Sequence, residues 1–252
     1  MDEVLIQAFM FIFGLIIGSF LNVCIWRLPR EESIIRPGSH CPACSTAFGV
    51  RDLVPVLSWL FLRGKCRACG EKISPRYPVV ELLSGGLFLA TYLHYELTPG
   101  LLAGLVFSGF MVAITFIDLD HQIILDGMLA LLAVCGLGLQ LWTGAVGIVN
   151  MLIGAGAGGG LLLLLAILSR GGMGGGDVKF AAALGFWLGW PGILLGLFIG
   201  FVLGGVISLL LLASGLRGRK DFIPFGPFIA IGAWIALLYG RKILGWYFGF
   251  LI

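Results

Sequence analysis

The sequence is poor in charged residues. Asp, Glu, Lys and Arg together make up 12% of the 252 residues, whereas hydrophobic residues make up 59% and mean hydropathy is +1.06. A soluble domain carries about 25% charged residues, so this composition excludes an ordinary soluble protein. The first apolar stretch also lacks a preceding basic segment and a small-residue cleavage site, which argues against a cleavable signal peptide. The sequence therefore predicts a protein that crosses the membrane several times.

Long apolar stretches account for most of the chain. A helix needs roughly 20 residues to cross a hydrocarbon core of about 30 Å. Eight stretches reach or approach this length: 4–26, 79–96, 100–118, 125–143, 147–168, 178–192, 193–214 and 224–240. We therefore expect an all-α polytopic membrane protein with about eight transmembrane helices. The four residues "GWPG" at 189–192 separate the sixth stretch from the seventh, so a count of seven helices stays open.

Basic residues are concentrated on one side of the predicted helices. Segment 27–78 contains nine of the 16 Lys and Arg residues, and the eight-helix topology brings five more to the same side, namely Arg170, Lys179, Arg217, Arg219 and Lys220. Because Lys and Arg are retained in the cytoplasm, we expect the N-terminus outside and segment 27–78 inside. The predicted division is a first transmembrane helix at 1–26, a cytoplasmic loop domain at 27–78 and a transmembrane helical bundle at 79–252.

The net charge of this loop indicates its surroundings. Its nine basic residues are offset by four acids, Glu31, Glu32, Asp52 and Glu71, which leaves +5. A positive loop next to a bilayer attracts anionic lipid headgroups. Since the positive-inside rule already accounts for the charge, no nucleic-acid partner is expected.

Two CxxC pairs lie in this loop. "CPAC" contains Cys41 and Cys44, and "CRAC" contains Cys66 and Cys69, with 21 residues between the pairs. Four thiolates at this spacing suit a tetrahedral Zn²⁺, and a loop this small needs the metal to hold its fold. Two disulfides are disfavoured on a reducing cytoplasmic face, and a redox pair would need no duplicate. The loop is predicted to be zinc-ribbon-like.

Four aspartates gather at one membrane face in the predicted topology. Asp118, Asp120, Asp126 and Asp177 all fall near the cytoplasmic ends of helices three to six. When two carboxyl groups lie close together, repulsion between like charges disfavours ionisation of both. One therefore keeps a proton while the other activates a water, as in aspartic proteases. The glycines before Asp177 leave room for a polypeptide substrate beside the acid. The alternative is a plain connecting loop in which Asp177 caps its helix.

The motifs that carry these residues resemble a known family. "GSFLNVCIWRLP", the two CxxC pairs, "RYPVVELLSG", "IDLDHQIILD" and "GMGGGDVKF" occur in the order seen in bacterial type IV prepilin peptidases, the GxGD class of intramembrane aspartic proteases. The resemblance implies cleavage of the basic leader of prepilins and pseudopilins, then N-methylation of the new N-terminus with S-adenosylmethionine. It implies the inner membrane of a bacterium, with Asp118 and Asp177 as the catalytic pair. Leu125 and Phe180 depart from the family pattern without affecting these acids.

The methyl-donor site is less well marked. Glu81 is an acid inside the second predicted span and is therefore a candidate for binding the donor; its alternative role is to pair with Arg76 or another basic residue. "GAGAGGG" at 154–160 matches GxGxxG in spacing, but it lies inside an apolar span and no strand precedes it. We interpret it as helix packing through two GxxxG pairs, Gly154 with Gly158 and Gly156 with Gly160.

Two other classes of protein are compatible with parts of the pattern. An ion- or proton-coupled transporter would use the aspartates to bind a cation and the zinc ribbon to dock a partner. Against it, the acids lie at helix ends rather than at mid-membrane, and the sequence has no visible internal repeat. A non-catalytic assembly protein would tolerate the loss of either acid.

Overall fold

The structure is a computed structural model that describes residues 3–169, 172–216, 218 and 223–249. Four basic residues used to predict the orientation, Arg170, Arg217, Arg219 and Lys220, lie outside these described residues. Within them the regular structure is helical, apart from two isolated bridges, His40 with Ala47 and Lys65 with Lys72. The predicted all-α class is confirmed.

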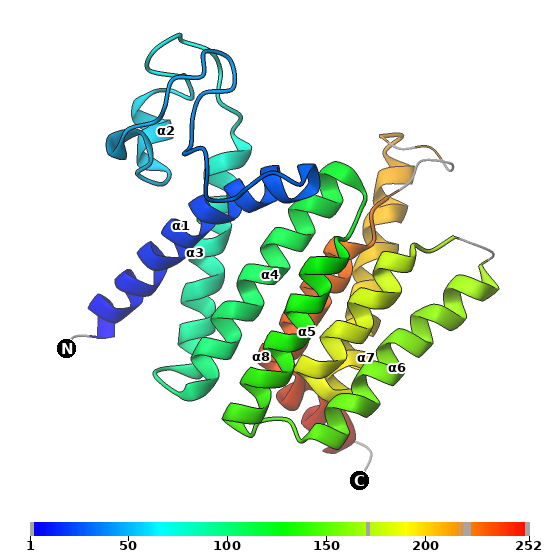
Figure 1. Cartoon of the computed structure of the whole chain (residues 1–252). Helices are drawn as coiled ribbons and strands as arrows, with labels where there is room; N and C mark the ends of the chain where they lie inside the picture. The colour runs from blue at the N-terminus through cyan, green and yellow to red at the C-terminus, as the bar shows by residue number, and fades with distance from the viewer. Residues whose placement is uncertain (1–2, 170–171, 217, 219–222, 250–252) are drawn as a thin grey trace. The chain divides into compact units, whose positions relative to one another are not determined.

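Seven long helices occupy the predicted apolar stretches (Figure 1). They are α1 (Glu3–Arg27), α3 (Arg76–Tyr95), α4 (Pro99–His121), α5 (Asp126–Thr143), α6 (Ile148–Leu168), α7 (Gly175–Ala213) and α8 (Gly226–Gly249). Between α1 and α3 lie the short helices η1 (Leu28–Arg30), η2 (Val50–Asp52) and α2 (Leu57–Phe61). Among the described residues, six helices are long and apolar enough to cross a membrane; α3 is the long helix that is not one of these six.

Helix α7 contains two of the predicted spans. At Gly189 the backbone is not helical, with φ 65° and ψ 177°, and Pro191 follows two residues later. A side chain at Gly158 would meet both Ala181 and Ile193, which would be about 18 Å apart in a straight helix. The chain therefore folds back at Gly189, as the "GWPG" sequence indicated, and the seven long helices, with α7 divided in two, are roughly consistent with the predicted eight.

The chain divides into two compact units, residues 1–101 and 102–252. In the first unit α1 packs against α3 through small residues. A Cβ atom at Gly14 would lie 2.7 Å from the Cα of Gly85, and one at Gly18 would lie 2.8 Å from the Cα of Glu81. The two backbones can approach this closely because both glycines lack a side chain. The predicted division at 1–26, 27–78 and 79–252 stays a prediction.

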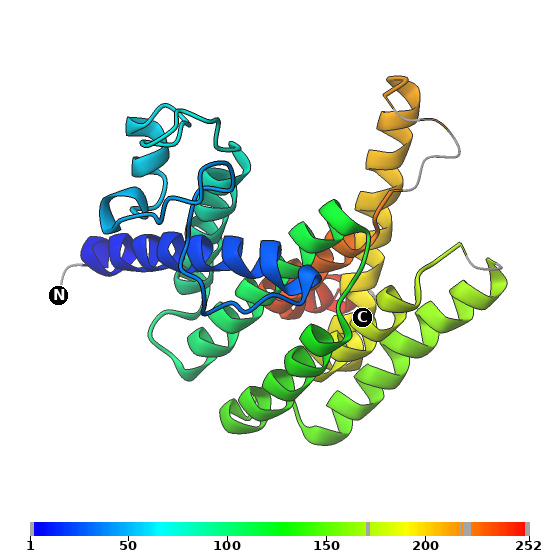
Figure 2. The same ribbon diagram turned by 45° about the horizontal axis from the view of Figure 1, so that its top comes forward.

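The second unit has a continuous apolar core. Trp187, Phe107, Phe180 and Leu132 are completely buried in it, and the indole of Trp187 donates to the Leu132 carbonyl at 2.8 Å. Helix α6 runs beside the first part of α7 in both views (Figures 1 and 2).

Close packing of α6 on α7 confirms half of the GxxxG prediction. Cβ atoms at Gly154 and Gly158 would lie 2.7 Å from backbone atoms of α7, whereas Gly156 and Gly160 face open space. The prediction for the second pair is wrong, because two residues advance a helix by more than half a turn and place that pair on another face.

Candidate active site and cysteine cluster

Asp118 and Asp177 come together at the ends of two helices of the second unit. Asp118 lies in the last turn of α4, and Asp177 is the third residue of α7. Their exposed fractions are 5% and 8%, and the charge of Asp177 acts on the carboxyl group of Asp118. Two buried carboxyl groups that interact electrostatically are candidates for a catalytic acid pair.

Asp118 is held by α8. The backbone N–H of Gly226 donates to Oδ2 of Asp118 at 3.0 Å, although the two residues are 108 positions apart in the chain. Asp118 also fixes the turn that follows it, because its carbonyl accepts the N–H of Gln122 at 2.9 Å. The carboxyl group is therefore oriented by backbone contacts from the beginning of another helix.

The glycines before Asp177 have different environments. Gly174 is the N-cap of α7, and its backbone hydrogen-bonds the carboxyl group of Asp177. A Cβ atom at Gly176 would lie 3.3 Å from Ile124, whereas one at Gly175 would meet nothing within 4 Å. The loop therefore caps α7 through Gly174 and Asp177 and also leaves open space at Gly175. A capping role for Asp177 and room for a substrate beside it do not exclude each other.

The other two aspartates have different surroundings. Asp120 and Asp126 are exposed. Both carboxylate oxygens of Asp126 accept hydrogen bonds from Nζ of Lys179 at 2.8 Å, which joins the first turn of α5 to the first turn of α7. The structure therefore separates a buried pair, Asp118 and Asp177, from two solvent-facing acids.

The four cysteines of the loop converge on one point. Their sulfur atoms all lie within 4.8 Å of one another, and Sγ of Cys41 is 3.8 Å from Sγ of Cys69. A tetrahedral Zn²⁺ with Zn–S bonds of about 2.3 Å requires sulfur atoms about 3.8 Å apart. The group has the composition and spacing of a zinc site, as the CxxC pattern predicted.

The two CxxC turns share one backbone pattern. The carbonyl of Cys41 accepts the N–H of Ser45 at 2.8 Å, and the carbonyl of Cys66 accepts the N–H of Gly70 at 2.9 Å. Ser45 and Gly70 both have positive φ, 56° and 75°. Each turn closes behind its second cysteine in this way, which directs the two thiols of each pair toward the same side.

The thiols of this cluster titrate unequally. Its hydrogen bond to the side chain of Thr46 lowers the pKa of Cys44 to about 6. For Cys69 a backbone hydrogen bond at Glu71 acts to lower the pKa, but burial and the neighbouring thiols outweigh it and raise the pKa to about 12. Crowded thiolates repel one another, so four of them need a bound cation to lose their protons together.

Glu81 lies in the first unit and is 7% exposed. Its Oε2 accepts the backbone N–H of Val56 at 2.7 Å, and its carboxyl group hydrogen-bonds the side chain of Ser19. Val56 has φ 62°, a conformation that is rare for a β-branched residue. Glu81 therefore holds a strained loop against α1 and α3.

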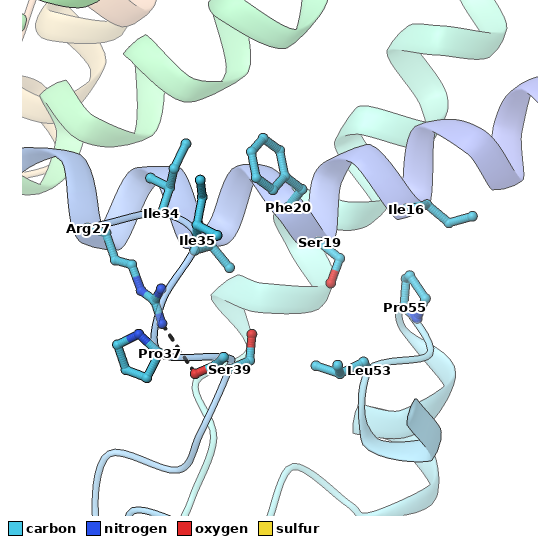
Figure 3. A pocket seen from close by; sticks show the side chains of 12 residues that line it. Ile16, Ser19, Phe20, Arg27, Ile34, Ile35, Pro37, Ser39, Leu53 and Pro55 are labelled. Atoms are coloured by element: carbon cyan, nitrogen blue, oxygen red, sulfur yellow. Dashed lines mark hydrogen bonds between the residues drawn. The ribbon is translucent and has the colours of Figure 1, made fainter. Parts of the chain in front are cut away.

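A cavity of about 350 Å³ opens beside this contact (Figure 3). Most of its wall is apolar, and its polar lining comes from Arg27, Ser19 and Ser39. The guanidinium of Arg27 donates to the carbonyls of Ser33 at 2.9 Å and Gly38 at 3.3 Å. Two of its five N–H groups are used in these bonds, and Arg27 is 7% exposed.

Two contacts at these sites were not anticipated from the sequence. The bond from Gly226 to Asp118 and the bond from Val56 to Glu81 both use backbone N–H groups, which every residue except proline carries. A partial signal is the sequence "FGPF" at 225–228, in which glycine and proline stand together at the start of an apolar span.

Comparison with known proteins covers nearly the whole chain. Residues 12–95 match the bacterial peptidase A24 N-terminal domain, and residues 105–209 match the type IV leader peptidase family. Relatives named prepilin leader peptidase/N-methyltransferase include those of Aeromonas hydrophila, 38% identical over 95% of this chain and 93% of the relative, and Bacillus subtilis, 35% identical over 95% and 97%. The relative of Dichelobacter nodosus is 36% identical over 96% and 94%. No solved structure matches the chain. Identity of this extent shows that the chain belongs to the type IV leader peptidase family.

Proposed function

We propose that this protein cleaves the basic leader from prepilins and pseudopilins and then methylates the new N-terminus. The observation that carries the proposal is the buried pair of Asp118 and Asp177, which interact although they are 59 positions apart in the chain. The names of the relatives support the same two activities and give no support to a transporter.

The pair is suited to peptide hydrolysis by an aspartic mechanism. One carboxylate takes a proton from a water molecule, whose oxygen forms a bond to the carbonyl carbon of the scissile peptide. The other carboxyl group is protonated and donates to the carbonyl oxygen. When the C–N bond breaks, the leaving amine receives a proton from the first acid. The carbonyl re-forms at the same time, its hydroxyl returns a proton to the second carboxylate, and the pair is back in its starting state.

Access to the pair is proposed to run along the glycines before α7. The space beside Gly175 is open, and Gly174 and Gly175 are exposed. We propose that an extended substrate backbone approaches Asp177 over Gly175. We place this approach at the cytoplasmic face of the bacterial inner membrane, as the distribution of Lys and Arg predicts, where anionic headgroups meet the basic loop.

The cysteine cluster is proposed to bind one structural Zn²⁺. The fit of the sulfur spacing to a tetrahedral site supports this, and so does the inability of four adjacent thiolates to persist without a cation. Bound zinc would hold together the two CxxC turns. Cys41, Cys44, Cys66 and Cys69 are the proposed ligands.

The methyl donor is proposed to bind in the cavity beside Ser19. S-adenosylmethionine supplies a methyl group on a positive sulfur, and it also carries a carboxylate. The guanidinium of Arg27, which lines the cavity, would bind the carboxylate. The carboxyl group of Glu81, which hydrogen-bonds Ser19 in the cavity wall, would supply a negative charge that favours a positive ligand. Glu81 is therefore proposed as a residue of the methyl-donor site.

The experiment that tests these activities uses the full chain in detergent micelles. A purified prepilin is incubated with wild type in the presence of S-adenosylmethionine, and mass spectrometry resolves the loss of the leader from the gain of a methyl group. We expect the leader to be lost first. An intact prepilin after prolonged incubation with folded protein would refute the peptidase, and a cleaved but unmethylated pilin would refute the second activity.

A further inference from the structure

The first turn of α8 presents one backbone N–H group to the candidate active site. Phe228 and Ile229 both donate their N–H groups to the carbonyl of Phe225, at 3.0 and 3.2 Å. Pro227 has no N–H group. Of the first helical residues, Gly226 therefore has an N–H group directed away from the helix, and it donates to Oδ2 of Asp118.

Residue 226 has no room for a side chain. A Cβ atom there would lie 2.5 Å from Oδ2 of Asp118 and 3.1 Å from its Cγ. Real Cβ atoms do not approach other atoms to 2.5 Å, so any other residue would displace the carboxyl group. This contact, rather than a positive φ, requires glycine at the position.

The start of α8 is also fixed in place by α7. A Cβ atom at Gly200 would lie 2.9 Å from the carbonyl oxygen of Phe228, and one at Gly232 would lie 2.8 Å from the backbone nitrogen of Gly200. Ile229 is completely buried. The part of α7 after Gly189 therefore positions the start of α8, and the part before Gly189 carries Asp177.

We propose that Gly226 is a positioning residue of the peptidase: its N–H group engages Oδ2 of Asp118, and its missing side chain lets that carboxyl group lie where it meets Asp177. Oδ1 is then left for the water and the shared proton. The inference rests on the proposed function, because it assigns Gly226 a part in the reaction of that pair.

The test compares Gly226→Ala with Gly245→Ala in the full-length protein. Both changes add one methyl group to α8, but a Cβ atom at Gly245 meets nothing within 4 Å. We expect Gly226→Ala to lower kcat for prepilin cleavage by about 10²-fold, as a misplaced catalytic group does, with KM little changed. Gly245→Ala should cleave as wild type does.

A second measurement on the same variants separates positioning from general damage. We expect methyl transfer to a pre-cleaved pilin to need the folded chain but not the acid pair, so Gly226→Ala should retain it. Equal loss of both activities would overturn the proposal, and so would wild-type kcat in Gly226→Ala. If wild type itself fails to cleave, the proposed function has failed instead, which is a distinguishable result.

Discussion

In the unit formed by residues 1–101, the converging cysteines are carried by turns of a small loop, and two of the four, Cys44 and Cys69, are exposed. In the unit formed by residues 102–252, the converging carboxyl groups are carried by the ends of long helices, and both are buried. Of the hydrophobic residues at 28–75, only Cys41 and Cys66 are buried, so the loop needs a ligand that binds the four thiols. The helical unit needs none, because its core already fixes the helix ends. A metal therefore completes the first arrangement, whereas packing alone completes the second.

The largest effect on the cleavage rate is expected from changes to the two buried acids of the second unit. Asp118→Asn and Asp177→Asn keep the size of the side chain but remove the base or the shared proton. Each should lower cleavage on the order of 10³-fold or more, while membrane insertion is unchanged. The rate is measured by the loss of prepilin on gels and by mass spectrometry.

Asp120→Asn and Asp126→Asn are the matched controls for these changes, because both side chains are exposed. Each should retain most of the cleavage rate, although Asp126→Asn loses the ion pair with Lys179. If Asp118→Asn cleaves normally while Asp126→Asn does not, the assignment of the first catalytic acid is wrong.

The second effect concerns the unit that needs a ligand. About one zinc per chain should copurify, and replacing any one of Cys41, Cys44, Cys66 or Cys69 by Ser should release it and expose the loop to limited proteolysis. Zinc is measured by elemental analysis. Cys135→Ser, outside the cluster, is the control and should keep its zinc. A protein without zinc in which thiol titration finds two disulfides would contradict the metal site.

A smaller effect separates two roles for Glu81. Gln at this position can still accept the N–H of Val56 but has no charge, whereas Ala removes both. If the acid contributes to the methyl-donor site, Glu81→Gln should reduce methyl transfer by about tenfold, the loss that about 1.4 kcal/mol produces, and leave cleavage nearly unchanged. Binding of S-adenosylhomocysteine, followed by calorimetry, should weaken in parallel.

The alternative outcome for Glu81 is equally specific. If the carboxyl group serves only to hold the loop at Val56, Glu81→Gln should methylate and bind as wild type does, and Glu81→Ala should fail in both. That result would remove Glu81 from the methyl-donor site. Wild type assayed with pre-cleaved pilin gives the reference rate, and Asp177→Asn should match it if the two activities use separate sites.

Much of this arrangement can be predicted from the sequence, for reasons that differ between residues. The apolar stretches and the CxxC spacing are local patterns, so they predict the helices and the cysteine cluster directly. The pairing of Asp118 with Asp177 follows from topology and family resemblance together. The role of Gly226 cannot be predicted from the sequence, because every residue except proline has a backbone N–H group and the sequence does not show which of them contacts Asp118. The prediction that Gly156 and Gly160 pack against another helix was wrong for a similar reason. A GxxxG spacing predicts a helix face without side chains, but it does not show whether another helix packs on that face.

The smallest expected effect is on stability, and it compares two glycines of the same motif, one that packs against α7 and one that does not. Gly158 and Gly156 are two residues apart in α6, but a Cβ atom at Gly158 would lie 2.7 Å from the carbonyl oxygen of Ala181, whereas one at Gly156 would meet nothing within 4 Å. Gly158→Ala should force α6 away from α7 and destabilise the protein by about 1–3 kcal/mol. Gly156→Ala should stabilise it by about 0.5–1 kcal/mol, because alanine loses less backbone entropy in a helix. Thermal unfolding in detergent measures both. Equal shifts of the unfolding temperature, with the same sign, would show that packing against α7 does not distinguish the two glycines. The claim that close packing holds the second unit together would then lose its support.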